Sequence, residues 1–416
     1  MLKNLKSALR LTALVAASCN TIHAGGLYLT EISAAETSLA GAGWAARAQD
    51  PSTAFTNPGG MTQLEGTQVQ FTAQALMVNT EFNSDNGGDS SLDNWTPGGS
   101  LFITHQVNQD WSVGFSVAGF FGLGLDYDNG WDGRYYVDEI NLVSIGFQPT
   151  VAYKINDQWS VGVGVALLST DFEQQLSVNT GPNQPDGKLK LDDTTTSTQI
   201  NLGIFYEPVA STRFGIQYLS ESDVDLETRP KFSGVDGTLI GTALSNNGLL
   251  NSKVDLDMTL PQSIMFSAFH QLTDEWAIMG NIGWQEWSAF GKVDIDVNAS
   301  SSISKDRGYD DTWHFAAGVQ YQLTEQWRLN TGIAFDTSMV DDDDVTPDLP
   351  TGDSWRYALG GTYAYSETLA FSAGYEIIWF GDTELDVERA IPGSQVSGTY
   401  ETYAIHFFSL SVNWKL

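Results

Sequence analysis

The chain is almost without cysteine, since Cys19 is the only one among 416 residues. It falls inside an N-terminal stretch that we expect to be removed, so the mature chain would carry no thiol. This excludes a disulfide framework, an iron–sulfur cluster and a cysteine-ligated zinc site in the mature chain. We expect no cofactor and no resident metal.

Positive charge and long apolar runs are also scarce. Lys and Arg number 19 against 51 Asp and Glu, which gives a formal net charge of −32. Such an excess of negative charge excludes nucleic acid as a partner and suits hydrated surface loops. No uncharged apolar run reaches the ~18 residues that a membrane helix needs, so a helical membrane protein is excluded as well.

The first 24 residues have the pattern of a secretory signal peptide. Lys3, Lys6 and Arg10 are followed by an apolar run over residues 11–18, and Ala24 offers a small residue for cleavage. We therefore predict a signal peptide over residues 1–24. The alternative is a lipoprotein signal that uses Cys19, but the preceding residues 16–18 lack the usual leucine.

Residues 64–416 show apolar residues with a period of two. In residues 143–155 the odd-numbered positions are apolar or aromatic, and the even-numbered ones are small or polar. This alternation places one set of side chains on each face of a strand. A soluble sandwich would have a polar outer face with fewer aromatic residues at the strand ends, so the pattern favours an all-β transmembrane antiparallel barrel.

Short and long links alternate between the predicted strands. The short turns lie near residues 108–110, 156–158, 208–212, 273–275, 324–326 and 366–367. Most are followed at once by an aromatic residue: Trp111, Trp159, Phe214, Trp276 and Trp327. The long loops are rich in Asp, Asn, Gly and Ser and lie near residues 81–97, 128–138, 178–190, 229–252, 298–308, 340–353 and 386–398. These links predict about fourteen strands, with an aromatic belt beside the short turns.

Residues 25–63 do not share the period of two. They are rich in Ala, Gly and Ser and contain two turn-forming stretches, Asp50-Pro51 and Asn57-Pro58-Gly59-Gly60. We predict a small plug, or hatch, folded inside the barrel. Asn57 and Pro58 are expected to hold its turn, because an Asn side chain can bind local backbone amides while Pro fixes the backbone; a plain exposed turn is the alternative.

The chain resembles a known family, the outer-membrane transporters of long-chain fatty acids and their aromatic-hydrocarbon relatives. The most specific matches are residues 38–46 and 50–61, which look like the family's hatch with its Asn-Pro-Ala motif. Gly59 stands at the third motif position, a departure that would loosen the turn. Further matches run through nearly the whole mature chain, at residues 149–156, 260–263, 284–288, 347–350 and 355–356.

The resemblance implies a fourteen-stranded barrel closed by the hatch, capture of ligand in a groove among the outer loops, and lateral exit through a kinked third strand. In this sequence the third strand is expected over residues 111–126, with Gly119, Gly122 and Gly124 at the kink. Glycine in a strand often marks a bulge, which gives this expectation a physical basis. The alternative is that these glycines only accommodate close neighbours in a curved wall.

Inward aromatic and apolar residues are candidates for a hydrophobic path. They are Phe120 and Phe121 on the third strand and Tyr403, Ile405 and Phe407 on the last. The last strand allows two interpretations, because a bulge at Phe407-Phe408 would reverse the phase and turn Ile405 toward lipid.

The expected partners are a hydrophobic small molecule, outer-membrane lipid and lipopolysaccharide, and we expect a monomer. A general porin for polar solutes is one alternative, but it would need opposed rows of charge. An esterase is another, suggested by residues 88–92, although no Gly-x-Ser-x-Gly motif is present. The acidic run 341–344 is more typical of a solvated loop than of a Ca²⁺ site, because it lacks an ordered ligand spacing.

Overall fold

The computed structural model describes residues 26–246, 248–297, 301–341, 344–387 and 395–416. The predicted signal peptide, residues 1–24, lies outside the described residues, as do Asp342 and Asp343 of the acidic run. No described helix is long and apolar enough to cross a membrane.

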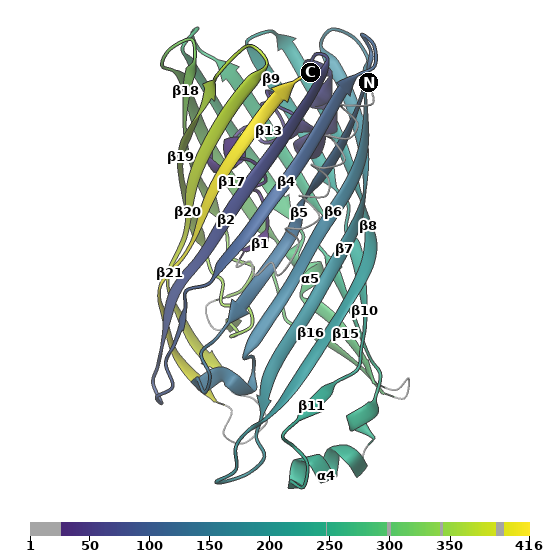
Figure 1. The fold of residues 1–416 in the computed structure, drawn as a ribbon, viewed down its shortest axis with the longest axis vertical. Helices are drawn as coiled ribbons and strands as arrows, with labels where there is room; N and C mark the ends of the chain where they lie inside the picture. The colour runs from purple at the N-terminus through teal and green to yellow at the C-terminus, as the bar shows by residue number, and fades with distance from the viewer. Residues whose placement is uncertain (1–25, 247, 298–300, 342–343, 388–394) are drawn as a thin grey trace, which may run out of the picture.

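The described residues form a closed antiparallel barrel of fourteen strands, as predicted (Figure 1). Each strand pairs with the next along the chain, and the last, β21, returns to the first, β2. In chain order the barrel strands are β2 (Thr67–Ser84), β4 (Trp95–Gln106), β5 (Trp111–Asp126), β6 (Glu139–Lys154), β7 (Trp159–Val178), β8 (Gly187–Val209), β9 (Thr212–Leu219), β13 (Ser263–Gln271), β14 (Trp276–Gln285), β17 (Thr312–Gln322), β18 (Trp327–Asp336), β19 (Ser354–Ala364), β20 (Leu369–Val387) and β21 (Val396–Lys415).

The strands alternate between lipid-facing and lumen-facing side chains. On β6, Phe147, Pro149 and Tyr153 are exposed, whereas Gln148 and Ala152 are buried toward the lumen. The predicted aromatic belt is present at the short-turn end, the upper end in Figure 1. There a Trp stacks or tilts against a Tyr of the next strand with ring centroids 4.2–4.8 Å apart, in the pairs Trp111–Tyr153, Trp159–Tyr206, Trp276–Tyr321 and Trp327–Tyr363.

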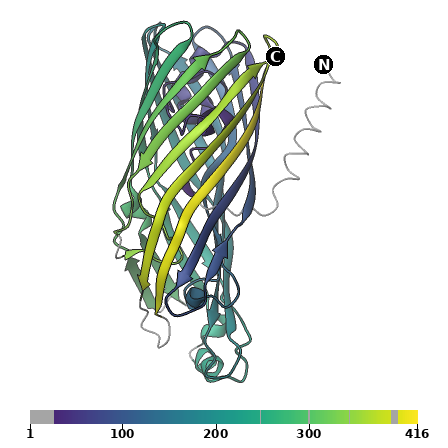
Figure 2. The ribbon, with the colours of Figure 1, turned by 90° about the vertical axis from the view of Figure 1, so that its left-hand side faces the viewer.

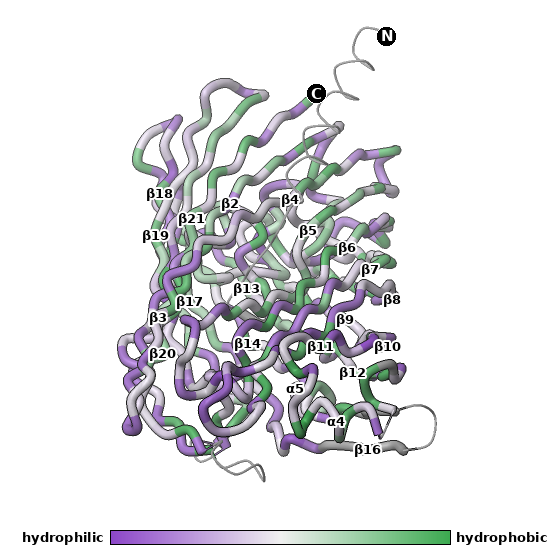
Figure 3. The backbone as a smooth tube through the Cα atoms, turned by 60° about the horizontal axis from the view of Figure 1, so that its bottom comes forward, coloured by the Kyte–Doolittle hydropathy of each residue, from purple (hydrophilic) through white to green (hydrophobic). Residues whose placement is uncertain are grey.

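A second group of outward tryptophans marks the other edge of the apolar band. Trp284 is paired with Trp313, and Trp355 with Trp379. On β19, Trp355 and Tyr363 are eight residues apart, which is roughly 27 Å along the strand. Because strands of such barrels are tilted by about 40° to the barrel axis, this distance is about 20 Å along the axis. Beyond this band the long loops carry many hydrophilic residues (Figure 3).

Several smaller elements lie at the long-loop end. A four-stranded sheet extends the wall beyond the barrel rim and pairs β10 (Ser222–Thr228), β12 (Val254–Leu260), β15 (Lys292–Val297) and β16 (Ser301–Asp306). The loops also contain β3 (Ser90–Leu92), η2 (Asp132–Tyr135), β11 (Lys231–Ser233), α4 (Leu239–Asn246), η3 (Leu249–Asn251) and α5 (Trp287–Phe290). The sequence had suggested only loops in most of these places.

The first described residues, 26–63, run inside the barrel toward its short-turn end (Figures 1 and 2). They form β1 (Gly26–Tyr28), α2 (Ala34–Thr37), α3 (Thr53–Thr56) and η1 (Pro58–Gln63) before β2 begins. We call residues 28–31 the N-terminal arm and residues 34–63 the luminal core. Almost every residue of the luminal core is buried, so it fills the lumen at its level.

Candidate functional site

The wall of the barrel has a break between β4 and β5. Their pairing runs from Gln106 opposite Ser112 to Leu101 opposite Val117 and then ends. Both strands continue, β4 back to Trp95 and β5 on to Asp126, without pairing to each other. The long-loop half of β5 therefore presents an edge that β4 does not cover.

A β-bulge lies where this break begins. Gly119 is opposite Ile145 and Phe121 is opposite Ser144, so Phe120 is an extra residue on β5. The extra residue lets two successive aromatic side chains point inward. The Phe120 ring lies 4.7 Å from the Phe55 ring of the luminal core, measured between centroids, and Phe121 contacts α5.

The three glycines predicted at the kink lie around this bulge. Gly119 precedes it, and Gly122 and Gly124 follow it opposite Val143 and Asn141 of β6. At Gly119, a Cβ atom would lie 2.8 Å from Leu29 of the N-terminal arm. Close approach of the arm therefore accounts for this glycine.

The N-terminal segment occupies part of the uncovered edge. In β1, Gly26 pairs with Gly122 and Tyr28 pairs with Phe121. The arm then turns into the lumen, where Tyr28, Leu29, Thr30 and Glu31 line a cavity.

This cavity has a volume of about 90 Å³ and is partly open to solvent. Much of its wall is apolar, and it reaches from the kinked strand to the last strand. The apolar and aromatic lining residues beyond the arm are Leu123, Trp287, Met339, Leu349, Pro350, Ile378, Phe380, Tyr403, Ile405 and Phe407.

Tyr403, Ile405 and Phe407 point into the lumen and are buried. Pairing between β2 and β21 is continuous through Phe407 and Phe408, so the alternative bulge at that position is wrong. The break in strand register lies nearer the long loops, at Gly381 of β20 and near Thr402 of β21. Both residues have positive φ.

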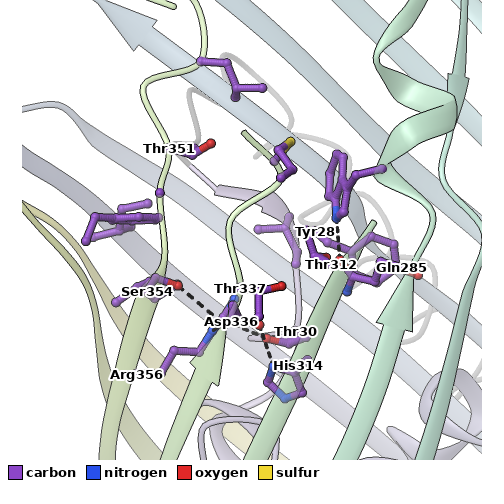
Figure 4. A pocket seen from close by; sticks show the side chains of 18 of the residues that line it. Tyr28, Thr30, Gln285, Thr312, His314, Asp336, Thr337, Thr351, Ser354 and Arg356 are labelled. Atoms are coloured by element: carbon purple, nitrogen blue, oxygen red, sulfur yellow. Dashed lines mark hydrogen bonds and ion pairs between the residues drawn. The ribbon is translucent and has the colours of Figure 1, made fainter. Parts of the chain in front are cut away.

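One end of the cavity is polar (Figure 4). Arg356 on β19 donates from Nε to Asp336 on β18 at 2.6 Å, and it also pairs with Glu31 of the arm. Asp336 in turn lies 2.7 Å from Nδ1 of His314, and Glu376 lies 3.5 Å from the Arg356 guanidinium. We call Glu31, His314, Asp336, Arg356 and Glu376 the charged cluster.

A long loop covers the cavity from the long-loop end. Its residues 349–352 line the cavity, and neighbouring Asp348 binds Arg307 at 2.7 Å. Burial alone would raise the pKa of Asp348, but the Arg307 guanidinium holds that pKa below its usual range. The Tyr127 hydroxyl also donates to the carbonyl of Pro347 at 2.7 Å, which ties this loop to the end of β5.

The Asn57-Pro58-Gly59 turn lies elsewhere. Asn57 Nδ2 donates to the carbonyls of Ala45 at 2.7 Å and Ile204 at 2.9 Å, and its Oδ1 accepts from the amide of Gly59 at 3.0 Å. None of the three residues lines the cavity. The turn therefore fastens the luminal core to β8.

Sequence reasoning missed the charged cluster. Arg356 lies in one of the family matches, residues 355–356, but that match does not indicate a charged group around it. Charged residues on the inward phase of three consecutive strands, at positions 336, 356 and 376, were the available signal. The partner Glu31 precedes the barrel, so no strand pattern could have indicated it.

A family model described as outer membrane protein transport protein (OMPP1/FadL/TodX) matches residues 14–416 of this chain. The long-chain fatty acid transport protein of Escherichia coli O6:H1 is 26% identical over 387 residues, covering 84% of this chain and 85% of that protein. Outer membrane protein P1 of Haemophilus influenzae is 26% identical over 425 residues, covering 90% of each.

Solved structures show the same fold. A Pseudomonas aeruginosa FadL homologue superposes with a TM-score of 0.85 at 21% identity, covering 94% of this chain and 100% of that one. The Ralstonia pickettii toluene transporter TbuX gives a TM-score of 0.70 at 15% identity, covering 93% and 99%.

Proposed function

The chain belongs to the OMPP1/FadL/TodX family of outer membrane transport proteins, and from that membership we propose that it carries small hydrophobic molecules through the outer membrane of a Gram-negative bacterium. Fatty acids and aromatic hydrocarbons are the two candidate classes, because relatives and structural neighbours are named for them. Passive transport needs no chemistry, since an apolar path only replaces water around the ligand with protein.

One observation carries the proposed route: Tyr28 and Leu29 touch both the apolar cavity and the uncovered edge of β5. A molecule in the cavity is thus separated from the break in the wall by the N-terminal arm. We propose that ligand is captured at the outer loops, enters the cavity, displaces the arm and leaves sideways between β4 and β5.

The luminal core is proposed to act as the hatch that blocks straight passage along the barrel axis. Its burial and its bonds to the wall support this role. A porin would need an open lumen instead. We further propose that the barrel works as a monomer, with outer-membrane lipid and lipopolysaccharide around its outward aromatic residues.

Transport without catalysis fits the described residues. The Ser90 and Ser91 hydroxyls, in the stretch that resembles a lipase motif, are engaged with the Asp128 backbone amide and carboxylate. The described histidines have other partners: Thr67 for His105, Thr212 for His270, Asp336 for His314 and Tyr375 for His406. We propose that the protein is not an enzyme.

The test is uptake of labelled oleate and toluene by cells that lack their own transporter. The intact chain should support uptake of at least one compound, and Gly122→Trp with Gly124→Trp should abolish it by filling the break. Ala317→Trp with Ala373→Trp is the matched control, because both residues are exposed on the outer face of unbroken ladders. No uptake by the intact chain, or undiminished uptake with the glycines replaced, would contradict the proposed route.

A further inference from the structure

The positive charge inside the cavity is already used. Among the described lining residues Arg356 is the only Lys or Arg. It is bound by Asp336 and Glu31, and it lies 3.5 Å from Glu376. His314, the other basic residue of the lining, has Nδ1 bonded to Asp336.

Carboxylates outnumber cations in this cluster. Glu31, Asp336 and Glu376 face one guanidinium and one imidazole, so the set carries excess negative charge when its carboxyls are ionised, even with the imidazole protonated. Protonation of one carboxyl would cancel the excess if the imidazole were also protonated, but the other two carboxylates would still bind Arg356. Arg307, beside the loop that covers the cavity, is likewise paired with Asp348.

Two carboxylate oxygens of the charged cluster, Glu31 Oε2 and Glu376 Oε2, lack a hydrogen-bond partner among the described residues, as do His314 Nε2 and Thr351 Oγ1 of the lining. Glu31 is 2% exposed, and its Oε2 has no hydrogen-bond partner in the protein. A ligand hydroxyl would supply the missing donor. An ionised carboxylate would supply further acceptors and a like charge, and burying that charge without a partner is costly.

From these contacts, and resting on the transport function proposed above, we propose that the cavity takes uncharged apolar molecules, preferentially those with one hydroxyl, such as alcohols or phenols, and rejects ionised carboxylates. Arg356 and Glu31, which line the cavity, are the specificity-determining residues, and Glu376 acts on them through Arg356. The apolar wall binds the body of the molecule, and the charged cluster decides which polar end it accepts.

Two photoreactive probes of equal chain length test this selectivity. Decanol and decanoate, each with a diazirine on the chain, are cross-linked at pH 8 to the full-length protein in outer-membrane vesicles, and the labelled residues are identified by mass spectrometry. The alcohol should label lining residues such as Ile378 and Phe380. The acid should label them at least roughly tenfold less, because like charges within several ångströms in a partly buried site repel strongly.

Removing the excess carboxylates should relax the selectivity. Glu31→Gln with Glu376→Gln, or Glu376→Gln alone if the double variant does not fold, should raise labelling by the acid at least severalfold. Glu65→Gln, an exposed residue just before β2, should leave it unchanged.

The outcomes separate this inference from the transport function. Labelling of the cavity by the acid as strongly as by the alcohol would overturn the selectivity but support a hydrophobic site. Weak acid labelling that does not rise in either folded Gln variant would overturn the role of the cluster. Failure of both probes to label the cavity would overturn the inference, whereas the transport function is decided separately by uptake of oleate and toluene.

Discussion

The luminal core and the N-terminal arm lie in the same lumen, but they are attached to the barrel differently. The wall binds the backbone of the luminal core through polar side chains on several strands: Gln148, Asn201, Gln217, Ser267 and Asn281. The arm has the short β1–β5 pairing and the contacts of Thr30 and Glu31 with Arg356. Segments with fewer independent contacts open at lower free-energy cost than well-attached ones, so the arm is the part that ligand can move more easily.

The largest effect is expected from removing the cation that holds the arm. Arg356→Met would leave three carboxylates without their guanidinium, and breaking a buried ion pair in this way costs about 3–5 kcal/mol. Hydrogen exchange should show loss of protection at residues 28–31 while residues 34–63 stay protected. Arg356→Lys, which keeps the charge, is the control. Equal loss of protection in both segments would show that the arm is not more weakly attached than the luminal core.

A single methyl group should test how closely the luminal core meets the wall. A Cβ at Gly215 would lie 1.8 Å from the carbonyl oxygen of Ala45, so Gly215→Ala must displace backbone. We expect the free energy of unfolding to fall by about 3 kcal/mol, the upper part of the overpacking range. At exposed Gly98 the nearest atom would be 3.4 Å away, so Gly98→Ala should change the unfolding temperature little.

The Asn57 turn should contribute somewhat less. Asn57→Ala removes bonds to Ala45, Ile204 and Gly59 and leaves buried backbone groups without partners, a loss of about 2 kcal/mol. Thermal unfolding of the purified barrel measures this, with exposed Asn79→Ala as the control. A luminal core loosened in this way should also pass more ions across a planar bilayer, and unchanged stability would show that the turn does not fasten the core.

The smallest effect is expected where a methyl group meets the arm rather than the core. A Cβ at Gly119 would lie 2.8 Å from Leu29 Cδ1, the end of a flexible side chain that can move away. Gly119→Ala should therefore cost below about 1 kcal/mol. If thermal unfolding shows the same loss for Gly119→Ala and Gly215→Ala, the arm is as firmly packed as the core.

Much of the barrel could be predicted from the sequence, because three signals agree. Side chains alternate along the strands, short and long links alternate between them, and aromatic residues follow most of the short turns. The third strand was placed at residues 111–126, where β5 lies. Single extra residues were harder to locate: a period of two survives on either side of Phe120 or Thr402, so only the pairing reveals where the phase changes.

The candidate site was less predictable. The phase of the exposed Trp414 predicts that Tyr403, Ile405 and Phe407 face the lumen, but only the continuous strand pairing excludes a bulge at Phe407-Phe408. The Arg356–Glu31 pair joins positions 325 residues apart, and no local pattern relates them. The four-stranded sheet of β10, β12, β15 and β16 was missed for two reasons. Only β16 falls in a predicted loop, residues 298–308; the other three strands alternate apolar with acidic residues like the barrel strands beside them, so no local pattern separates them into a second sheet.

A reversible disulfide between the arm and β5 tests whether the arm must move for ligand to leave the barrel. Tyr28→Cys with Phe121→Cys places two thiols on paired residues of β1 and β5, and Thr67→Cys with His105→Cys does the same in the unbroken β2–β4 ladder. Uptake of a labelled hydrophobic compound is compared for each barrel before and after reduction. We expect oxidation of the first pair to stop uptake, reduction to restore it, and the second pair to have no effect; full uptake with the arm locked to β5 would contradict lateral exit past the arm.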